Sequence, residues 1–512
     1  MNIHLVDWIV FAIIFIGLIY SGFYCRKHIK GVSDFVVAGR NVRVFLGLST
    51  GLAEGIGLIT ISWVMQQGFL YGFGYMWLAT IELFLVTVVF GFFGFVIVRF
   101  RQGKYMTLPE YFEKRYSKNT RILVGIITAF AGIVNMSIFP IVGSQFLVYF
   151  LGIPLHLDIF GLQIPTIASL MVFLIALALT FSFIGGMVSV LVTDFLQSIL
   201  VAATIVIMLV LVAKNVGFAG LSQGLKSNLG EYAFNPFLSG GYGISFFVWA
   251  ILAGVFGYCA FAPSMQKVAS TNNAKTARAM TMLSSIFNKG RLVMVLLVGM
   301  SALIVLGKVP PESSGVSAEN WSRVAGPLYL GKLVPPVLMG LILAGLCASF
   351  VACVNGYMLG WSSVIVNDVI CAIKKTPMTP KVHVRTLRII LLLMAAFLAI
   401  FGVFYEPTET IQDYIYLTGT MFTGIGVALV FGLYWKKTST AGAVSAVLIT
   451  GIFPTLDLIL RRIPNMEYAH VVKSQYTGLA TILSAIFGCI MLSILFSNKN
   501  QPPVVSNVKG GV

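Results

Sequence analysis

The stretch "STGLAEGIGLITISW" (residues 49–63) places one glutamate and three glycines inside an otherwise apolar run. Glu54 lies near the middle of a segment that is long enough to cross a membrane. Each glycine in a helix interior costs about 1 kcal/mol relative to alanine. A break inside lipid leaves backbone N–H and C=O groups without partners, so it survives only when it is buried in protein or faces a water-filled cavity. We therefore predict that this span unwinds at half-depth and that the freed carbonyls of Leu52 and Ala53 can coordinate a cation.

Two roles are open for the Glu54 carboxylate. Ionisable groups inside a membrane usually mark the path of an ion or a substrate, which makes Glu54 a candidate ion-binding residue. Alternatively, the glycines form a packing face and Glu54 pairs with a cation on a neighbouring helix. Lys289 and Arg291 are candidates for that cation, because "IFNKGRLVMV" places them near the start of the eighth predicted span. A carboxylate can also be both paired and coupled to transport.

The composition fits a protein that is solvated by lipid. Of the 512 residues, 58% are hydrophobic and 10% are charged, whereas soluble domains carry about 25% charged residues. The formal charge of +17 indicates Lys and Arg held in loops on one side of a bilayer, and we expect no nucleic-acid partner. The six cysteines have no metal-ligand spacing and are expected to be small buried side chains. We expect no cofactor and no metal site among these cysteines.

Apolar windows bounded by charged or turn residues predict an all-α polytopic membrane protein with about thirteen transmembrane helices. The predicted spans are 5–25, 44–70, 73–98, 122–150, 164–185, 186–213, 242–265, 280–306, 334–370, 386–405, 411–435, 441–460 and 476–497.

A second interrupted span is predicted in "GISFFVWAILAGVFGYCAFAPSMQKVAS" (residues 243–270), where Gly254, Gly257 and Pro263 lie at candidate break points. Two interrupted spans five helices apart indicate a five-helix inverted-repeat (5+5) transporter core with broken helices near 51–57 and 254–263. The predicted organisation is a first helix and cytoplasmic link (1–43), a first repeat (44–213), a second repeat (242–435), two C-terminal helices (436–497) and a disordered tail (498–512).

The basic residues predict the orientation in the membrane. With the N-terminus outside, most of the 34 Lys and Arg fall in inward loops, chiefly in "RFRQGKYMTLPEYFEKRYSKNTR" (99–121) and "IKKTPMTPKVHVRTLR" (373–388). Cytoplasmic loops carry such an excess, so we expect a multi-pass protein of the inner or plasma membrane with a cytoplasmic C-terminus.

Several stretches together resemble motifs of the sodium/solute symporter family. In order along the chain, they are "SDFVVAGRNV" (33–42), "MTLPEYFEKRYS" (106–117), "GGMVSVLVTDFLQS" (185–198), "SMQKVASTNNAKTARAM" (264–280) and "GLYWKKTSTAGA" (432–443). The resemblance covers roughly residues 5–450. It implies sodium-driven uptake of a small solute by alternating access, through an inverted-repeat core.

The resemblance also implies a sodium site, and this sequence departs from it. The carbonyl positions fall on Leu52 and Gly55, and the hydroxyl pair of the ninth span falls on Ala352 and Cys353. Sodium is a hard cation that prefers oxygen ligands, so a methyl group and a thiol are poor substitutes. The usual sodium site therefore lacks its two hydroxyl ligands here. Ser349 and Asn355, each about one turn away, are candidates to supply oxygen instead.

Asp194 matches the family's Thr-Asp pair and is a candidate for a second cation site nearer the cytoplasm. The alternative is a carboxylate at a helix N-terminus after the Gly185–Gly186 turn, stabilised by the helix dipole. Coupling to sodium, coupling to protons through Glu54, and no coupling all remain open at this point.

The family architecture places the solute between the second, fourth, seventh, ninth and eleventh spans. Candidate substrate-binding residues are the polar side chains there, although interhelical hydrogen bonding is an alternative for each. They include Gln66, Asn135, Tyr258, Asn355, Tyr357 and Thr418. Few fixed charges in this zone favour a neutral or zwitterionic solute, such as a sugar or an amino acid. An organic acid becomes plausible if Lys289 or Arg291 turns inward.

Three functions compete on the sequence alone. The first is cation-coupled symport of a small polar organic solute, by a monomer in contact with lipid. The second is a transporter-fold solute sensor or an uncoupled carrier, which Ala352 and Cys353 favour. The third is a membrane enzyme, which we exclude because no catalytic arrangement is visible among the residues.

Overall fold

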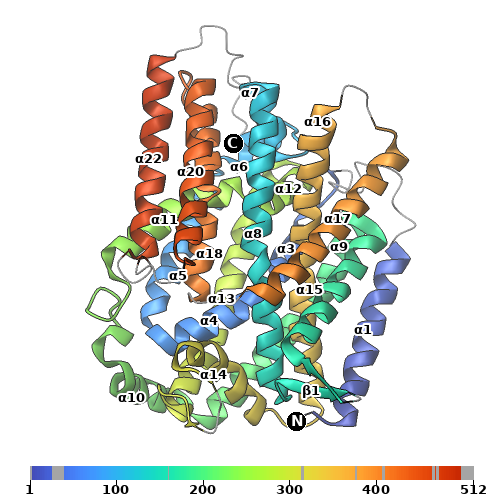
Figure 1. Cartoon of the computed structure of the whole chain (residues 1–512), viewed down its shortest axis with the longest axis vertical. Coiled ribbons are helices and arrows are strands. Elements are labelled where there is room, and N and C mark those ends of the chain that lie inside the picture. Colours follow the sequence, from blue (N-terminus) through green and yellow to red (C-terminus); the bar gives the residue numbers. More distant parts are fainter. Residues whose placement is uncertain are drawn as a thin grey trace.

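The structure is a computed structural model that describes residues 3–25, 40–159, 161–312, 316–374, 378–405, 410–463, 468 and 472–496. The predicted tail at 498–512 lies outside these residues, as does most of the motif at 33–42. The described residues contain eleven helices that are long and apolar enough to span a membrane, and two bent helix pairs raise this number to thirteen. The predicted number of spans is confirmed (Figure 1).

The first half of the chain begins with one separate helix and continues through five predicted spans. Its elements are α1 (Leu5–Cys25), α3 (Val44–Glu54), α4 (Leu58–Tyr71), α5 (Gly74–Phe84), η3 (Leu85–Phe92), α6 (Ile97–Gln102), α7 (Leu108–Arg115), α8 (Lys118–Leu151), β1 (His156–Ile159), β2 (Leu162–Pro165), α9 (Thr166–Asn215), α10 (Gly217–Leu229) and η4 (Gly230–Ala233). The hairpin pairs His156 with Pro165 in antiparallel register.

The second half contains seven predicted spans. Its elements are α11 (Gly243–Ala260), α12 (Ala262–Ser270), α13 (Ala274–Leu306), α14 (Ala318–Leu333), α15 (Leu338–Val364), η6 (Ile365–Ile370), α16 (Cys371–Ile373), α17 (Pro380–Phe404), α18 (Ile411–Thr420), α19 (Thr423–Tyr434), α20 (Thr440–Leu460) and α22 (Ser474–Leu495).

Helix α9 holds two predicted spans in one continuous element. Its fifty residues include the candidate spans Thr166–Phe183 and Val190–Asn215. Asp194 therefore lies inside a helix and not in the first turn of a new helix after the glycine pair, which removes the helix N-terminus alternative.

The short connecting helices lie at two opposite ends of the molecule. In Figure 1, α6, α7 and α16 lie toward the upper end, and β1, α10 and α14 lie toward the lower end. At the upper end arginines join separate elements: the Arg101 Nε on α6 donates to the Thr271 carbonyl after α12 at 2.7 Å, and the Arg115 Nε on α7 donates to the Gly432 carbonyl on α19 at 3.0 Å. The basic segment at 99–121 is thus packed against other elements of the protein.

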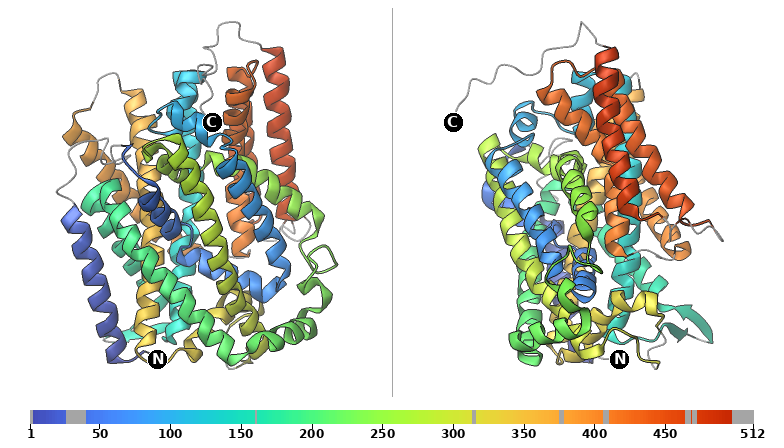
Figure 2. Two further views of the ribbon diagram at one scale, coloured as in Figure 1. Left: turned by 180° about the vertical axis from the view of Figure 1, so that it is seen from behind. Right: turned by 90° about the vertical axis from the view of Figure 1, so that its left-hand side faces the viewer.

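Helix α15 lies at the centre of the bundle. Its span is the most buried of the candidate spans among the described residues, and it packs against α1, α8 and α9. The views from behind and from the side show α22 and α20 at the periphery and α1 at the opposite edge (Figure 2). The ninth predicted span is therefore surrounded by protein, and its polar residues face other helices.

The first predicted break is present. Helix α3 ends at Glu54, Gly57 has an extended backbone, and α4 begins at Leu58 with its axis turned by 58°. Between the two helices the side chain of Ile56 is fully buried and Gly57 is buried, whereas Gly55 is exposed. The sequence predicted this break from the helix-weakening glycines.

The second break lies at the end of the predicted range. Helix α11 continues through Gly254 and Gly257 and stops at Ala260, because Phe261 is extended and Pro263 opens the first turn of α12. A proline is tolerated there since the first turn has no intrahelical partner for its N–H. A further bend of 42° separates α18 from α19, which the sequence analysis did not predict.

The N-terminal helix is joined to the central helix by one buried carboxylate. The Asp7 Oδ1 accepts from the backbone N–H groups of Val337, at 2.7 Å, and Gly340, at 3.0 Å. Asp7 is fully buried, and Val337 has a positive φ of 72°. The carboxylate thus satisfies N–H groups at the start of α15 that have no partner within the helix.

Replacing Asp7 by alanine is expected to destabilise the protein by about 2 kcal/mol, because two buried N–H groups lose a charged acceptor. A lowered unfolding temperature of the detergent-purified protein is the measurement. Glu231→Gln is the control, since the Glu231 side chain is 64% exposed in a surface pair with Lys226. Equal unfolding temperatures for the Asp7 variant and the control would show that Asp7 does not hold α15.

Candidate functional site

Two adjoining cavities lie between α4, α5, α11, α13 and α15. Their volumes are about 360 Å³ and about 330 Å³. The residues that line both cavities are Thr60, Trp63, Glu82, Val86, Tyr258, Ser264, Lys289 and Tyr357. We refer to the two cavities together as the central chamber. Its size is that of a pocket for a small organic molecule.

An ion pair crosses the central chamber. The Lys289 ammonium donates to the Glu82 carboxylate, and the Tyr416 hydroxyl donates to the other Glu82 oxygen at 2.5 Å. The side chains of Lys289 and Glu82 are 18% and 22% exposed, so both reach the chamber space. Lys289 was considered as a partner for Glu54, but its partner in the structure is Glu82, on α5.

Glu82 was missed by the sequence analysis, although a signal was present. It is a carboxylate inside the apolar third predicted span, which is the same feature that singled out Glu54. No glycines flank Glu82, so the pattern that indicates a helix break does not mark it. A search for every intramembrane carboxylate would have found it.

Aromatic rings form much of the chamber wall. Trp63, on α4, packs edge-on against Tyr416 with centroids 6.2 Å apart, and its Nε1 donates to the Gln412 Oε1 at 3.2 Å. Across the chamber, Tyr357 packs against Phe261 with centroids 5.0 Å apart. Phe261 is the extended residue between α11 and α12, so the second break places an aromatic ring in the chamber.

The structure divides the predicted substrate-binding residues into two groups. Asn135, Tyr258 and Tyr357 line the chamber. Thr418 lies behind Asn135, and its Oγ1 accepts a hydrogen bond from the Asn135 Nδ2 at 2.7 Å. The other two candidates hold helices together away from the chamber lining.

Gln66 and Asn355 are those two candidates. The Gln66 Nε2 donates to the Ser322 Oγ at 3.0 Å, and its Oε1 accepts from the Ile411 N–H at 3.1 Å. The Asn355 Oδ1 accepts from the Ser182 Oγ at 2.6 Å. Both side chains are buried, and these interhelical bonds are the alternative that the sequence analysis allowed for every polar candidate.

The chamber reaches the first helix break. Gly51 and Gly55 line its second cavity together with Lys267, Ser284 and Asn288. The C-terminal carbonyls of α3 therefore lie next to chamber space, as predicted. The backbone of Glu54 ends α3, but its side chain lies outside the described residues.

Three side chains donate to three successive carbonyls at this helix end. The Lys267 Nζ donates to the Thr50 oxygen at 3.2 Å. The Asn288 Nδ2 donates to the Gly51 oxygen at 2.9 Å. The Arg291 Nη1 donates to the Leu52 oxygen at 3.2 Å. One of the two predicted carbonyl ligands, Leu52, thus has a guanidinium as its partner.

The Lys267 ammonium also faces the second predicted cation site. Its Nζ lies 3.9 Å from the Asp194 Oδ2, and both side chains are buried. Lys267 stands on α12. The structure thus connects Asp194 with the end of α3 through one lysine.

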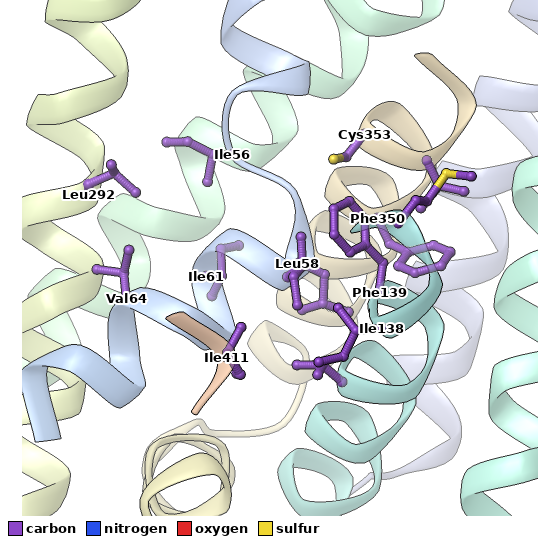
Figure 3. Packing of buried hydrophobic residues seen from close by; sticks show 14 of the residues in the cluster. Ile56, Leu58, Ile61, Val64, Ile138, Phe139, Leu292, Phe350, Cys353 and Ile411 are labelled. Atoms are coloured by element: carbon purple, nitrogen blue, oxygen red, sulfur yellow. The ribbon is translucent and has the colours of Figure 1, made fainter. Parts of the chain in front are cut away.

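The ninth span meets the break at Cys353. Figure 3 shows the α3–α4 connection passing between α13, which carries Leu292, and α15, which carries Cys353. A Cβ atom added at Gly57 would come within 2.6 Å of the Cys353 Cβ. Ala352 and Ser349 are fully buried beside it, and the Ser349 hydroxyl donates to the Leu346 carbonyl at 2.8 Å. Only glycine allows the backbones to approach this closely.

The sequence model of the Sodium:solute symporter family matches residues 35–451. The chain belongs to this family. The resemblance seen in the motifs is thereby confirmed.

Named members of the family match most of the chain. The sodium/glucose cotransporter of Vibrio parahaemolyticus is 23% identical, over 98% of this chain and 92% of that protein. The sodium/proline symporter of Staphylococcus aureus (strain Newman) is 24% identical, over 97% and 93%. The osmoregulated proline transporter OpuE of Bacillus subtilis (strain 168) is 23% identical, over 86% of each.

Solved structures show the same fold. A Na+-coupled sialic acid symporter in a substrate-bound outward-open state has a TM-score of 0.79 at 16% identity, covering 98% of this chain and 99% of that chain. MhsT in complex with L-phenylalanine has a TM-score of 0.51 at 15% identity, covering 86% and 98%. The predicted all-α fold with a five-helix inverted-repeat core is confirmed for this symporter-family protein.

The chamber ion pair yields a prediction that needs no knowledge of the solute. Glu82→Gln or Lys289→Gln each leaves a charge without its partner, and each is expected to cost roughly 2 kcal/mol. The double variant is expected to cost less than the sum of the two, because it leaves no unpaired charge. Thermal unfolding of the purified variants measures all three.

The surface pair Lys226–Glu231 serves as the control cycle, because its side chains are 68% and 64% exposed. Its single variants are expected to change stability by about 0.5 kcal/mol at most. Additive effects in the Glu82–Lys289 cycle would contradict the assigned pair.

Proposed function

We propose that this symporter-family protein is a secondary transporter that moves a small polar organic solute across the cytoplasmic membrane by alternating access. The observation that carries the proposal is a series of cavities along α11 and α12, interrupted by one barrier. The family membership supports transport as the activity, in place of catalysis.

The cavities follow one another along the chain. A polar cavity of about 290 Å³, the vestibule, is lined by Tyr242 and Phe246 at the start of α11. The central chamber is lined by Gly254 and Gly257 farther along α11 and by Lys267 on α12. A solute that passes along α11 would therefore meet the vestibule, the chamber and the space beside the α3 break in turn.

The barrier between vestibule and chamber is made of aromatic and amide side chains. Gln412 accepts from the Trp63 Nε1 at 3.2 Å, and the Tyr242 hydroxyl donates to the Gln67 Oε1 at 2.6 Å. The rings of Tyr71 and Tyr242 stack at 4.1 Å. These contacts join α4, in the predicted first repeat, to the start of α11 and to α18, which lie in the predicted second repeat. Parting them would open the chamber to the vestibule.

The chamber chemistry favours a zwitterionic or neutral polar solute. Glu82 and Lys289 offer one negative and one positive group, and each neutralises the other when no solute is present. An amino acid could satisfy both charges at once, whereas an organic acid would leave Glu82 unpaired. The relatives are named for glucose, proline and sialic acid, which lie within the range that this chamber volume admits. Amino acids are our first choice and sugars our second.

The arginine-rich layer at α6 and α7 supports an orientation in which that end faces the cytoplasm. The N-terminus then lies outside, and the vestibule at the start of α11 opens to the outside. We propose that the transporting unit is a monomer, since residues of one chain line both cavities of the chamber.

A solute sensor or uncoupled carrier is the second candidate. Ala352 and Cys353 favour it, because they put a methyl group and a thiol where the family resemblance implies hydroxyls. A sensor would bind solute without moving it.

Solute counterflow separates a transporter, coupled or uncoupled, from a sensor without assuming a coupling ion. Proteoliposomes are loaded with pools of unlabelled amino acids, sugars or organic acids, and entry of the matching labelled solute is followed. Transport predicts a transient accumulation for one class. Saturable binding to the purified protein with no counterflow supports the sensor.

A chamber-filling substitution tests the solute path. A Cβ added at Gly257 meets only the Gly419 oxygen at 3.7 Å and a Thr423 methyl group at 3.9 Å, which are ordinary contacts. Gly257→Leu is therefore expected to fold and to lower counterflow by roughly tenfold or more, because the added side chain occupies the space of the solute.

Gly17→Leu is the matched control for that variant. Gly17 lies in α1 with nothing within 4 Å of an added Cβ, and its counterflow is expected to equal that of the wild type. Unchanged counterflow in a folded Gly257→Leu protein would remove the chamber from the solute path.

A further inference from the structure

The structure assigns the cation position at the broken end of α3 to side chains of the protein itself. We infer that Arg291 and Lys267 take the place of a bound sodium ion there, so that this transporter works without sodium. The transport part of this inference rests on the proposed function, whereas the ion-binding part can be tested without a solute.

The first argument is the occupation of the carbonyls. The C-terminal end of a helix carries a partial negative charge, and its last carbonyls have no partners within the helix. At α3 the positive groups of Lys267 and Arg291 bond to the oxygens of Thr50 and Leu52. The partial negative charge at this helix end therefore faces two positive groups of the chain itself.

The second argument is the ligand set. A sodium ion needs several oxygen ligands around it. Leu52 is engaged by Arg291, and the ninth span offers Ala352 and Cys353, which provide no hard oxygen. The Ser349 hydroxyl donates its proton to the Leu346 carbonyl of its own helix and keeps its lone pairs, so it offers one hard oxygen, which is fewer than sodium needs. The residues present therefore do not fit sodium at this position.

The third argument is the position of the fixed charges. The Arg291 guanidinium spans from α3 to α9, because its second terminal nitrogen donates to the Ser198 carbonyl at 3.5 Å. The Lys267 ammonium spans from α3 to Asp194, which is also on α9. Each cation therefore joins the broken helix to α9, and a sodium ion at either point would meet a like charge in a low-dielectric site.

Helices α13 and α12 carry the cationic side chains that contact the end of α3. Arg291 and Asn288 lie three residues apart on α13 and share the face toward α3, whereas Lys289 contacts Glu82 on α5. One helix thus supplies both the closure of the α3 end and the basic group of the chamber. The joint between α3 and α9 is then independent of the sodium concentration.

Binding of radioactive sodium to the purified full-length protein tests the ion-binding part. We expect no saturable, potassium-resistant binding, and equal unfolding temperatures in sodium chloride and potassium chloride, since a bound ligand would stabilise the folded state. Saturable sodium binding by the wild type would overturn the inference, including binding near the hydroxyls of Ser284 and Ser285 in the second cavity.

Counterflow with sodium replaced by choline tests the transport part. We expect the same rate with and without sodium. Counterflow that requires sodium would overturn the inference and leave the proposed function intact, whereas no counterflow of any solute under either condition, with no sodium binding, would reject the proposed function alone.

Substitution of Arg291 tests whether its charge is what matters. Arg291→Ala is expected to lower counterflow by roughly ten- to hundredfold, because a charged hydrogen bond to the Leu52 oxygen is lost. Guanidinium ions at millimolar concentration are expected to restore part of the rate by filling the vacated space, and urea, which has a similar shape and no charge, is not. Arg291→Lys is expected to keep most of the rate.

Lys275→Gln is the control for these variants, since Lys275 is an exposed cation on the same helix α13. Wild-type counterflow in a folded Arg291→Ala protein, or equal rescue by urea and guanidinium, would contradict the role of a fixed cation. If Arg291→Ala does not fold, Arg291→Gln provides the same comparison with the hydrogen-bond donors kept and the charge removed.

Discussion

A helix that stops in the middle of a membrane must find partners for its last carbonyls, because lipid offers none. This constraint acts at Glu54, where α3 ends, and the surrounding structure is arranged around it. Lys267, Asn288 and Arg291 reach the carbonyls from two other helices. The buried side chain of Ile56 and the close approach of Gly57 to Cys353 cover the connection. The break is thus held by protein on one side and by the central chamber on the other.

Charges are also paired within the chamber. Its acid and base, Glu82 and Lys289, face each other across space that is open to a solute. The Tyr416 hydroxyl holds the carboxylate in place, and the Trp63–Gln412 bond closes the chamber toward the vestibule. In the proposed transport cycle, solute binding and opening of the barrier would therefore involve neighbouring groups on α4, α5 and α18. A solute that reorders the Glu82 pair would also act on Tyr416, which packs against Trp63.

Much of the architecture was predictable from the sequence, because hydrophobic length and helix-breaking residues are local properties. The thirteen spans and the break at Gly55–Gly57 follow from such patterns, and the family resemblance supplied the repeat. Ala352 and Cys353, where the family resemblance implies hydroxyls, were also visible. By contrast, the partner of Lys289 was not, since Glu82 lies on a distant helix and no periodic pattern specifies which faces meet. The helical positions of Gly254 and Gly257 show that glycine alone does not break a helix whose other contacts support it.

The position of the Arg291 guanidinium relative to the Leu52 oxygen tests this account most directly. An experimental density map of the protein purified in sodium chloride, at a resolution that shows side chains, would display it. The account predicts the guanidinium on the Leu52 oxygen and the Lys267 ammonium between Thr50 and Asp194. An ion coordinated by the Leu52 oxygen, with Arg291 turned away from α3, would contradict it.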